Sequence, residues 1–148
     1  MPAPTANAPA LMFYDGLCGF CNASVQWLLK HDRHDRFRFA PQQSAFASQV
    51  LARHGIDQAQ MIENNSVYLV MDLDANGERV LQRSDVTVQC LFSLGGIWKI
   101  LGYAFQIVPK VIRDAVYAVT AKNRFRLAGK YDVCPMPSAE QRAKFLGV

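Results

Sequence analysis

The sequence predicts an α/β fold in which helices flank a mixed sheet of four strands and extra helices follow at the C-terminal end. Short apolar runs alternate with helical patterns in the first half of the chain, and this alternation is typical of parallel strands joined by crossover helices. An Asn-Gly pair at 76–77 separates two strand-like segments, which indicates an antiparallel hairpin. From residue 84 onward the apolar residues recur at helical spacing.

The elements of the first half follow from their apolar patterns and stop signals. Residues 10–14, "ALMFY", predict a short buried strand, and residues 37–41, "FRFAP", predict a second one. A helix over residues 18–31 connects them because its apolar positions lie on one side. The next helix is expected at 44–54, with Gly55 as its stop.

The second half contains the predicted hairpin and the remaining helices. Its strands are "SVYLVMD" and "ERVLQR", on either side of the Asn-Gly turn. A helix is expected from Ser84, which would be its N-cap, to Gly95. Two further helices are expected at 97–107 and 109–121. The order of strands and helices is that of a thioredoxin-like domain.

The chain is expected to form one domain. Residues 1–9 contain no basic residue and no apolar core, so we interpret them as a disordered leader and not as a signal peptide. Residues 10–148 then form a single thioredoxin-like domain, with a helical extension from about residue 97.

Charge and hydrophobicity exclude some classes of function. The formal net charge is +4, but the basic residues are scattered and "KNRFRLAGK" is the only clearly cationic tract. A nucleic-acid-binding protein usually has a denser basic stripe, so we expect no nucleic-acid partner. The most apolar segment, residues 91–112, is interrupted by glycines, Lys99, Gln106 and Pro109. We therefore expect no membrane association and a cytoplasmic location, where paired thiols are more often catalytic or metal-binding than structural.

Two cysteines three residues apart, Cys18 and Cys21, lie at the predicted start of the first helix. Unpaired N–H groups and the helix dipole stabilise a thiolate at such a position. The first cysteine of such a pair is expected to be exposed, so Cys18 is the predicted nucleophile. Cys21 would lie one turn behind it, within disulfide reach, and would resolve the mixed disulfide. Electrons would pass through this dithiol without an organic cofactor.

Two other interpretations of the pair stay open. Both cysteines could be small buried residues of a core, because free cysteine packs well. They could also bind zinc, with Cys134 as a third ligand, in a structural or interaction module.

Asp15 lies three residues before Cys18. It could accept a proton or tune the resolving thiol, or it could simply end the strand and cap the turn. A carboxylate beside Cys18 would also oppose thiolate formation.

Several segments together resemble the DCC family of predicted thiol-disulfide oxidoreductases, whose name denotes an Asp followed by two cysteines. They are "YDGLCGFCNASVQWLL", "RFRFAPQQS", "RSD", "RDAVYAVTAKNRFR" and "CPMP". The resemblance covers most of the chain, from about Leu11 to Leu146. It implies a thioredoxin-like fold, protein-disulfide reductase or related exchange activity, and functional roles for Asp15, Cys18 and Cys21. The implied partner is a protein disulfide or a low-molecular-weight disulfide.

The chain departs from thioredoxin itself just before the third predicted strand. Thioredoxins carry a cis-proline there, facing the active-site disulfide, and this chain has Ser66. The thioredoxin mode of substrate docking therefore has no sequence support here. Because the cis-proline also helps to keep metal ions from the thiols, its absence modestly favours the zinc alternative.

"QRSDVTV" offers a possible substitute for that docking element, because it is similar to the glutathione-binding helix start of glutaredoxins. Ser84 and Asp85 would hold the γ-glutamyl end of glutathione, and Arg83 would add a cation near the thiols. The alternative is plain helix capping by Ser84, with Asp85 favourable to the helix dipole.

The remaining candidates are less specific. Cys90 is expected in the core because it has helical spacing to apolar neighbours. Cys134 could be a third exchanging thiol or a buried anchor of the tail. The aromatic residues of the late helices are expected to be core residues, although they could instead form a partner surface or lie on a membrane. These residues are Trp98, Tyr103, Phe105 and Tyr117.

Overall fold

Four strands form one mixed sheet in the computed structural model of the chain. They are β1 (Ala10–Tyr14), β2 (Phe37–Pro41), β3 (Tyr68–Met71) and β4 (Arg79–Gln82), in the order β2-β1-β3-β4. β1 and β2 are parallel, whereas β3 runs antiparallel to both β1 and β4. The predicted hairpin pairing and the predicted parallel crossover are therefore both confirmed.

The structure describes most of the chain between residues 10 and 145. The described residues are 10–33, 35–57, 59–60, 67–71, 78–82, 84–129, 139 and 141–145. The expected leader, the Asn-Gly turn, Arg83 and Cys134 lie outside these residues.

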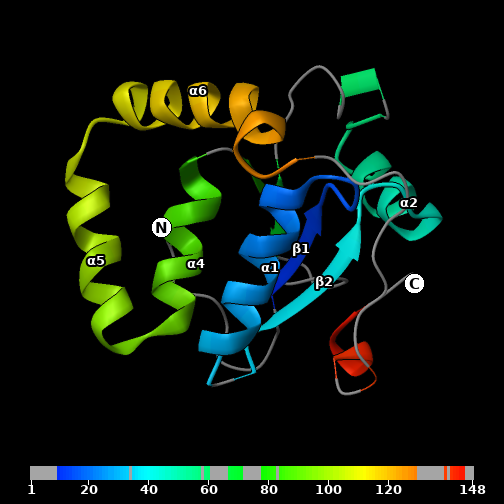
Figure 1. Cartoon of the computed structure of the whole chain (residues 1–148), viewed down its shortest axis with the longest axis horizontal. Helices are drawn as coiled ribbons and strands as arrows, with labels where there is room; N and C mark the ends of the chain where they lie inside the picture. The colour runs from blue at the N-terminus through cyan, green and yellow to red at the C-terminus, as the bar shows by residue number, and fades with distance from the viewer. Residues whose placement is uncertain are drawn as a thin grey trace.

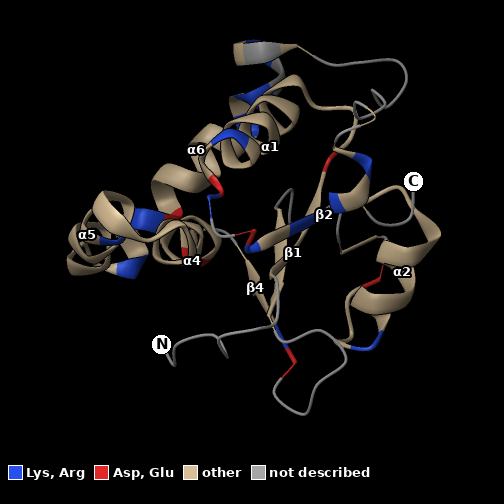
Figure 2. Ribbon diagram, turned by 90° about the horizontal axis from the view of Figure 1, so that it is seen from below, with Lys and Arg blue, Asp and Glu red and all other residues tan. Residues whose placement is uncertain are grey.

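Helices cover both faces of the sheet (Figures 1 and 2). α1 (Gly19–His31) and α4 (Ser84–Leu94) pack on one face, and α2 (Ala45–Ala52) packs on the other. The alternation of side chains along β1 supplies both cores, because successive residues of a strand point to opposite faces. Met12 and Tyr14 pack toward α1 and α4, and Leu11 and Phe13 pack toward α2. This is the predicted thioredoxin-like α/β arrangement.

Two extra helices follow the thioredoxin-like core, as predicted. α5 (Gly96–Ile107) lies along α4, and α6 (Lys110–Ala128) crosses the ends of α4 and α1 (Figure 1). Gly102 allows α5 to approach α4 closely, because a Cβ atom there would lie 3.2 Å from Leu91 Cβ. None of the helices in the described part of the chain combines the length and apolar character that spanning a membrane requires.

Near the C-terminal end, the short 3₁₀ helix η1 (Arg142–Lys144) leads to Phe145. Phe145 forms a parallel bridge with Phe39 of β2, an edge strand of the sheet. Its ring packs in the core against Tyr14 and Phe39, with ring centroids 6.2 and 5.6 Å away. The segment around Phe145 therefore closes one edge of the sheet.

Three details differ from the prediction. α6 ends at Ala128 instead of residue 121, because the stop signal is Gly129, with a φ of +80°, and not the charged tract before it. Ser84 is the first residue of α4 and not its N-cap. Tyr103 and Phe105 are exposed and are not core residues, whereas Trp98 and Cys90 do pack on or in the core as expected.

Candidate functional site

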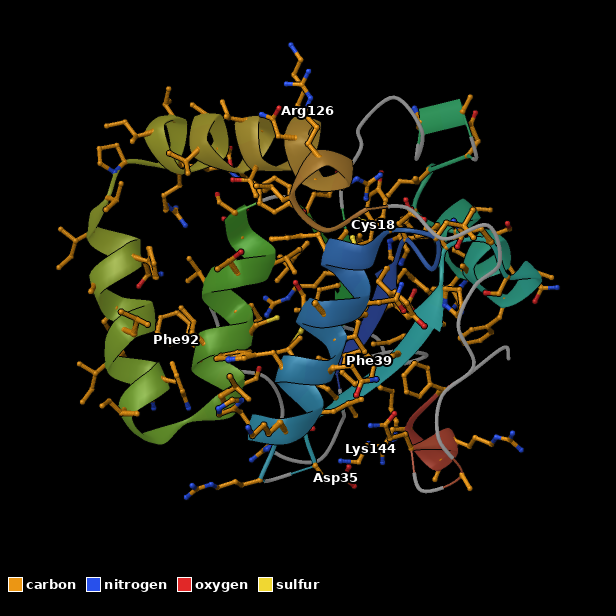
Figure 3. The ribbon with its side chains drawn as sticks, viewed as in Figure 1. Cys18, Asp35, Phe39, Phe92, Arg126 and Lys144 are labelled. Carbon is orange, nitrogen blue, oxygen red and sulfur yellow. The ribbon has the colours of Figure 1, made fainter. Side chains whose placement is uncertain are left out.

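The two thiols lie where the loop after β1 enters α1 (Figure 3). Cys18 is the N-cap of the helix, and its sulfur accepts a hydrogen bond from the Cys21 N–H over 3.4 Å. Both cysteines are free thiols. The first-turn N–H groups of a helix stabilise negative charge on an atom in this position. The predicted placement of the pair at a helix start is therefore confirmed.

Side-chain amides fix the loop that carries Cys18. Asn22 Nδ2 donates to the carbonyl oxygens of Gly16 and Cys18, at 2.9 and 2.8 Å. Gln43, which lies between β2 and α2, accepts the Gly16 N–H through Oε1 over 3.1 Å. These bonds satisfy backbone groups that a turn would otherwise leave to water, so the backbone around the thiols is held in one arrangement.

Both sulfurs are buried, and the expectation that Cys18 is exposed is wrong. Cys18 has a relative exposure of 0% and Cys21 of 4%. Cys18 belongs to the core cluster on the α1 face of the sheet, and the Gly129 carbonyl, just after α6, accepts the N–H of the neighbouring Gly19 over 3.0 Å. A motif of four residues carries no information about the distant segments that pack around it.

Asp15 caps the turn and also makes an ion pair. Its Oδ1 accepts the Leu17 N–H at 3.0 Å and the Gln43 amide at 2.8 Å. Its Oδ2 lies 3.0 Å from Nη2 of Arg124, a residue of α6. The capping role considered from the sequence is therefore confirmed, and the role of Asp15 as a proton acceptor stays a prediction.

Arg124 is the site residue that the sequence analysis missed. Its Nη1 donates to Cys21 Sγ over 3.4 Å while Nη2 holds the Asp15 carboxylate. One guanidinium group thus links the acid of the motif to its second thiol. The sequence signals were the cationic tract "KNRFRLAGK" and the family-like segment "RDAVYAVTAKNRFR". Neither indicates which of its basic residues points toward the thiols.

The environment of Cys21 favours its protonated form. Burial is the main cause that raises the pKa of Cys21 from 9.0 to about 12, and the neighbouring Cys18 raises it further. The Arg124 guanidinium acts in the opposite direction but is outweighed. Cys21 therefore keeps its proton at neutral pH.

An apolar groove of about 640 Å³ adjoins Cys21 between α1, α4 and α6. This volume is in the usual range for ligand pockets. Apolar side chains make up most of the wall, and Cys90 also lines it. The polar groups in the wall include Tyr117, Arg113 and Arg124, all from α6.

The family of this chain follows from a comparison with known proteins. A family model described as DCC1-like thiol-disulfide oxidoreductase matches residues 12–130. The chain belongs to this family. The match includes both thiols and Arg124, and it confirms the resemblance stated from the sequence.

Two curated proteins are similar to this DCC1-like chain, and the name of one of them also refers to the DCC family. The uncharacterized protein YuxK of Bacillus subtilis is 30% identical over 141 residues, which cover 92% of this chain and 93% of the relative. A chloroplastic DCC family protein of Arabidopsis thaliana is 26% identical over 131 residues, which cover 85% of this chain and 69% of the relative. No solved structure matches the chain significantly.

In this DCC1-like chain, the predicted glutathione-binding residues contact α6. The Ser84 hydroxyl donates to the Asp114 carboxylate, and Asp85 forms an ion pair with Lys110 at 2.6 Å. Both side chains are therefore engaged by residues of α6. Arg83 lies outside the described residues, and the glutathione site stays a prediction.

The backbone before β3 also contacts α6. The Val67 N–H donates to the Tyr117 hydroxyl over 3.2 Å. Val67 follows Ser66, the position at which thioredoxins carry their cis-proline, and Ser66 lies outside the described residues. In this DCC1-like chain, the Tyr117 side chain of α6 therefore accepts a hydrogen bond from the backbone just before β3.

The zinc alternative uses Cys134 as a third ligand beside Cys18 and Cys21. Within the residues that the structure places, no group of three or more His, Cys, Asp or Glu side chains could hold a metal ion. Cys134, the predicted third ligand, lies outside them, so its role is still a prediction.

Proposed function

We propose that the chain is a thiol-disulfide oxidoreductase of the protein-disulfide reductase type, with Cys18 as nucleophile and Cys21 as resolving thiol. The observation that carries the proposal is the pair of free thiols one helical turn apart, with the Cys18 sulfur at the N-terminus of α1 and accepting a backbone N–H. Membership of a family described as thiol-disulfide oxidoreductases supports the same reaction class.

The reaction would proceed by two exchanges. The Cys18 thiolate attacks one sulfur of a substrate disulfide, that S–S bond breaks, and the departing substrate sulfur takes up a proton. Cys21 then loses its proton and attacks Cys18, which releases the second substrate thiol and leaves a Cys18–Cys21 disulfide. The substrate gains two electrons and two protons, and the dithiol loses them.

Arg124 and Asp15 bear on the second exchange. Cys21 keeps its proton in the resting state, because burial raises its pKa to about 12. Arg124 donates to the Cys21 sulfur, so it would stabilise the thiolate as the proton leaves. Asp15 would hold the guanidinium in place and act as a proton acceptor close to the resolving thiol.

Substrate access requires movement over Cys18. Cys18 is fully buried, and the segment that ends α6 is bonded to the neighbouring Gly19 through the Gly129 carbonyl. The substrate class would be a protein or low-molecular-weight disulfide that reaches Cys18 when this segment is displaced, and glutathione is one such candidate. The apolar groove next to Cys21 suits apolar groups beside the substrate disulfide. No organic cofactor would be required, and a reducing compartment such as the cytoplasm would keep the dithiol ready to react.

The surroundings of the sulfurs argue against the two alternatives from the sequence. Cysteines that merely fill a core would not need a carboxylate and a guanidinium group beside them, since buried charges are costly. A zinc ion bound by Cys21 would meet the positive charge of Arg124, which lies 3.4 Å from that sulfur. Metal analysis of the purified chain checks the second point, and stoichiometric zinc would contradict the oxidoreductase proposal.

Trapping tests the assigned roles directly. A Cys21→Ser variant should accumulate a mixed disulfide at Cys18 when it is incubated with oxidised glutathione or a disulfide-containing protein, because the resolving thiol is gone. The matched Cys18→Ser variant keeps every other cysteine and should accumulate much less. Mass spectrometry of the intact chain measures both. Equal capture by the two variants would contradict Cys18 as the nucleophile.

A further inference from the structure

Large apolar side chains point outward from α5 and from the first half of α6. The most exposed are Ile107 at 84%, Val111 at 81% and Ile97 at 74%. We call this region the α5–α6 surface, and it is formed by Ile97, Ile100, Ile107, Val111, Ile112, Val116 and Val119. An exposed apolar area that extends over two helices usually marks a binding surface.

The pattern on α5 is the reverse of that on an ordinary surface helix. Gly102 is its buried residue, and it faces α4. Ile97, Ile100 and Ile107 recur at helical spacing and are far more exposed. A surface helix normally presents polar residues on the side away from the core. The outer side of α5 is therefore built to contact an apolar phase or surface.

Positive charge accompanies the apolar residues. Between Gly95 and Leu127 the sequence has six basic residues and one acidic residue, Asp114. That single carboxylate already interacts with Ser84 and Lys110. The ribbon of Figure 2 shows basic positions on both α5 and α6, and Arg126 extends away from the domain in Figure 3. Three of the basic residues lie beside carboxylates of the domain: Lys110 and Arg113 beside Asp85, and Arg124 beside Asp15. The other three, Lys99, Lys122 and Arg126, are exposed.

We propose that the α5–α6 surface binds the face of a bilayer that contains anionic lipids. Exposed aliphatic side chains with Lys and Arg beside them are the signature of a helix that lies in the membrane interface. The α5–α6 junction, with Ile107 and Val111 on either side of it, would enter the boundary between headgroups and acyl chains. The exposed Lys99 of α5 and the exposed Lys122 and Arg126 of α6 would contact anionic headgroups.

Charge also favours a lipid surface over a second copy of the chain. In a two-fold dimer the same surface meets itself, so the basic residues of α5 and α6 would face the same positive charge. The net charge of +4 acts in the same direction. An anionic bilayer complements both the charge and the apolar character of the surface.

The proposal concerns a surface that contains neither thiol, so it is tested separately from the redox activity. The full chain is mixed with vesicles of phosphatidylcholine alone or of phosphatidylcholine with phosphatidylglycerol, and the protein that floats with the vesicles is measured. The chain should float with the anionic vesicles, and added salt should release much of it because salt screens the attraction.

Matched variants locate the contact. Ile107→Asp combined with Val111→Asp should lower vesicle binding by about tenfold or more, because it removes buried apolar area and adds negative charge. The control Gln49→Asp lies at an exposed position of α2, on the far face of the sheet, and should bind like the unaltered chain. A Lys99→Gln and Lys122→Gln pair should weaken binding to anionic vesicles.

The outcomes separate this proposal from its competitors. Loss of binding in the double Asp variant with an unchanged circular dichroism spectrum supports it. No flotation of the unaltered chain, or equal loss in Gln49→Asp, overturns it. A dimer seen by sedimentation that the double Asp variant abolishes, in a chain that does not float, overturns it in favour of self-association.

Discussion

Arg124 contacts two groups whose burial is costly in free energy, a carboxylate and a thiol. It holds Asp15 at 3.0 Å and reaches the Cys21 sulfur at 3.4 Å. Its side chain and that of Asp15 are only 11% and 12% exposed. Water therefore screens the ion pair weakly, and removal of either charge would leave the other buried without a partner.

Loss of Arg124 alone should destabilise the fold strongly. Arg124→Gln leaves the Asp15 carboxylate buried without its cation, and the expected loss in the free energy of unfolding is about 3–5 kcal/mol. Adding Asp15→Asn should recover a large part of that loss, because both charges are then absent. Urea denaturation of the single and double variants measures the coupling.

Arg126 provides a control on the same helix. It is exposed and extends away from the domain in Figure 3, so Arg126→Gln should change stability by no more than about 0.5 kcal/mol. Additive effects of Asp15→Asn and Arg124→Gln would show that the two side chains do not stabilise each other.

Residues of the site differed in how far the sequence could reveal them. Asp15, Cys18 and Cys21 lie within seven positions, so their spacing and the helix start were enough to bring them together. Arg124 lies 103 residues after Cys21, and no local pattern says which face of α6 meets the thiols. The burial of Cys18 was mispredicted for a similar reason, since it results from tertiary packing that a local motif does not reveal.

At the scale of elements, α6 lies across the site and contacts α4, the start of β3 and the thiol motif. Its first turns contact the start of α4 through Asp114 and Lys110. Further along, Tyr117 accepts the Val67 N–H before β3, and Arg124 contacts the thiol motif. Exposure of Cys18 should therefore depend on how readily α6 leaves the domain.

Tyr117→Phe should make Cys18 more reactive. The substitution removes one hydrogen bond between α6 and the domain, which is worth about 0.5–1.5 kcal/mol. If α6 opens as a unit, iodoacetamide should alkylate Cys18 roughly two- to twelvefold faster, as those energies imply. Mass spectrometry of the modified peptide gives the rate.

Val119→Ala is the control, because Val119 is exposed on the outer side of the same helix. Its alkylation rate should match that of the unaltered chain. An unchanged rate in Tyr117→Phe would indicate that only the end of α6, near Gly129, lifts from Cys18.

The elements themselves were largely predictable because their signals are local. The apolar runs of β1 and β2 are visible in the sequence and are confirmed. The helix expected at 44–54 is also present, although it is shorter, with Ser44 as its N-cap. The length of α6 was not predicted, because its last turns are rich in charged residues that resemble a loop. Those residues remain helical until Gly129 adopts a positive φ.

For the molecule as a whole, two buried thiols couple stability to alkaline pH. Burial raises the pKa of both Cys21 and Cys90 from 9.0 to about 12. Between these values the unfolded chain has lost both protons while the folded chain keeps them. A raised pKa therefore contributes full stability below pH 9, and this contribution is lost as pH rises toward 12.

Cys90→Ala should make the alkaline decline shallower. Above pH 9, each such thiol lowers the free energy of unfolding by about 1.4 kcal/mol per pH unit. The decline of this free energy with pH should therefore be less steep in the variant by about that amount. Urea denaturation at several values between pH 8 and pH 10.5 measures it. Parallel declines for the two chains would mean that Cys90 titrates alike in the folded and unfolded states.

The contact between Phe145 and β2 has a consequence for anyone who handles this molecule. β2 would otherwise present a row of backbone donors and acceptors, together with aromatic rings, to any neighbouring chain. The residues around Phe145 thus shield part of this edge from pairing with another molecule. A substitution at Phe145 that detaches them should favour aggregation, whatever the oxidation state of the thiols.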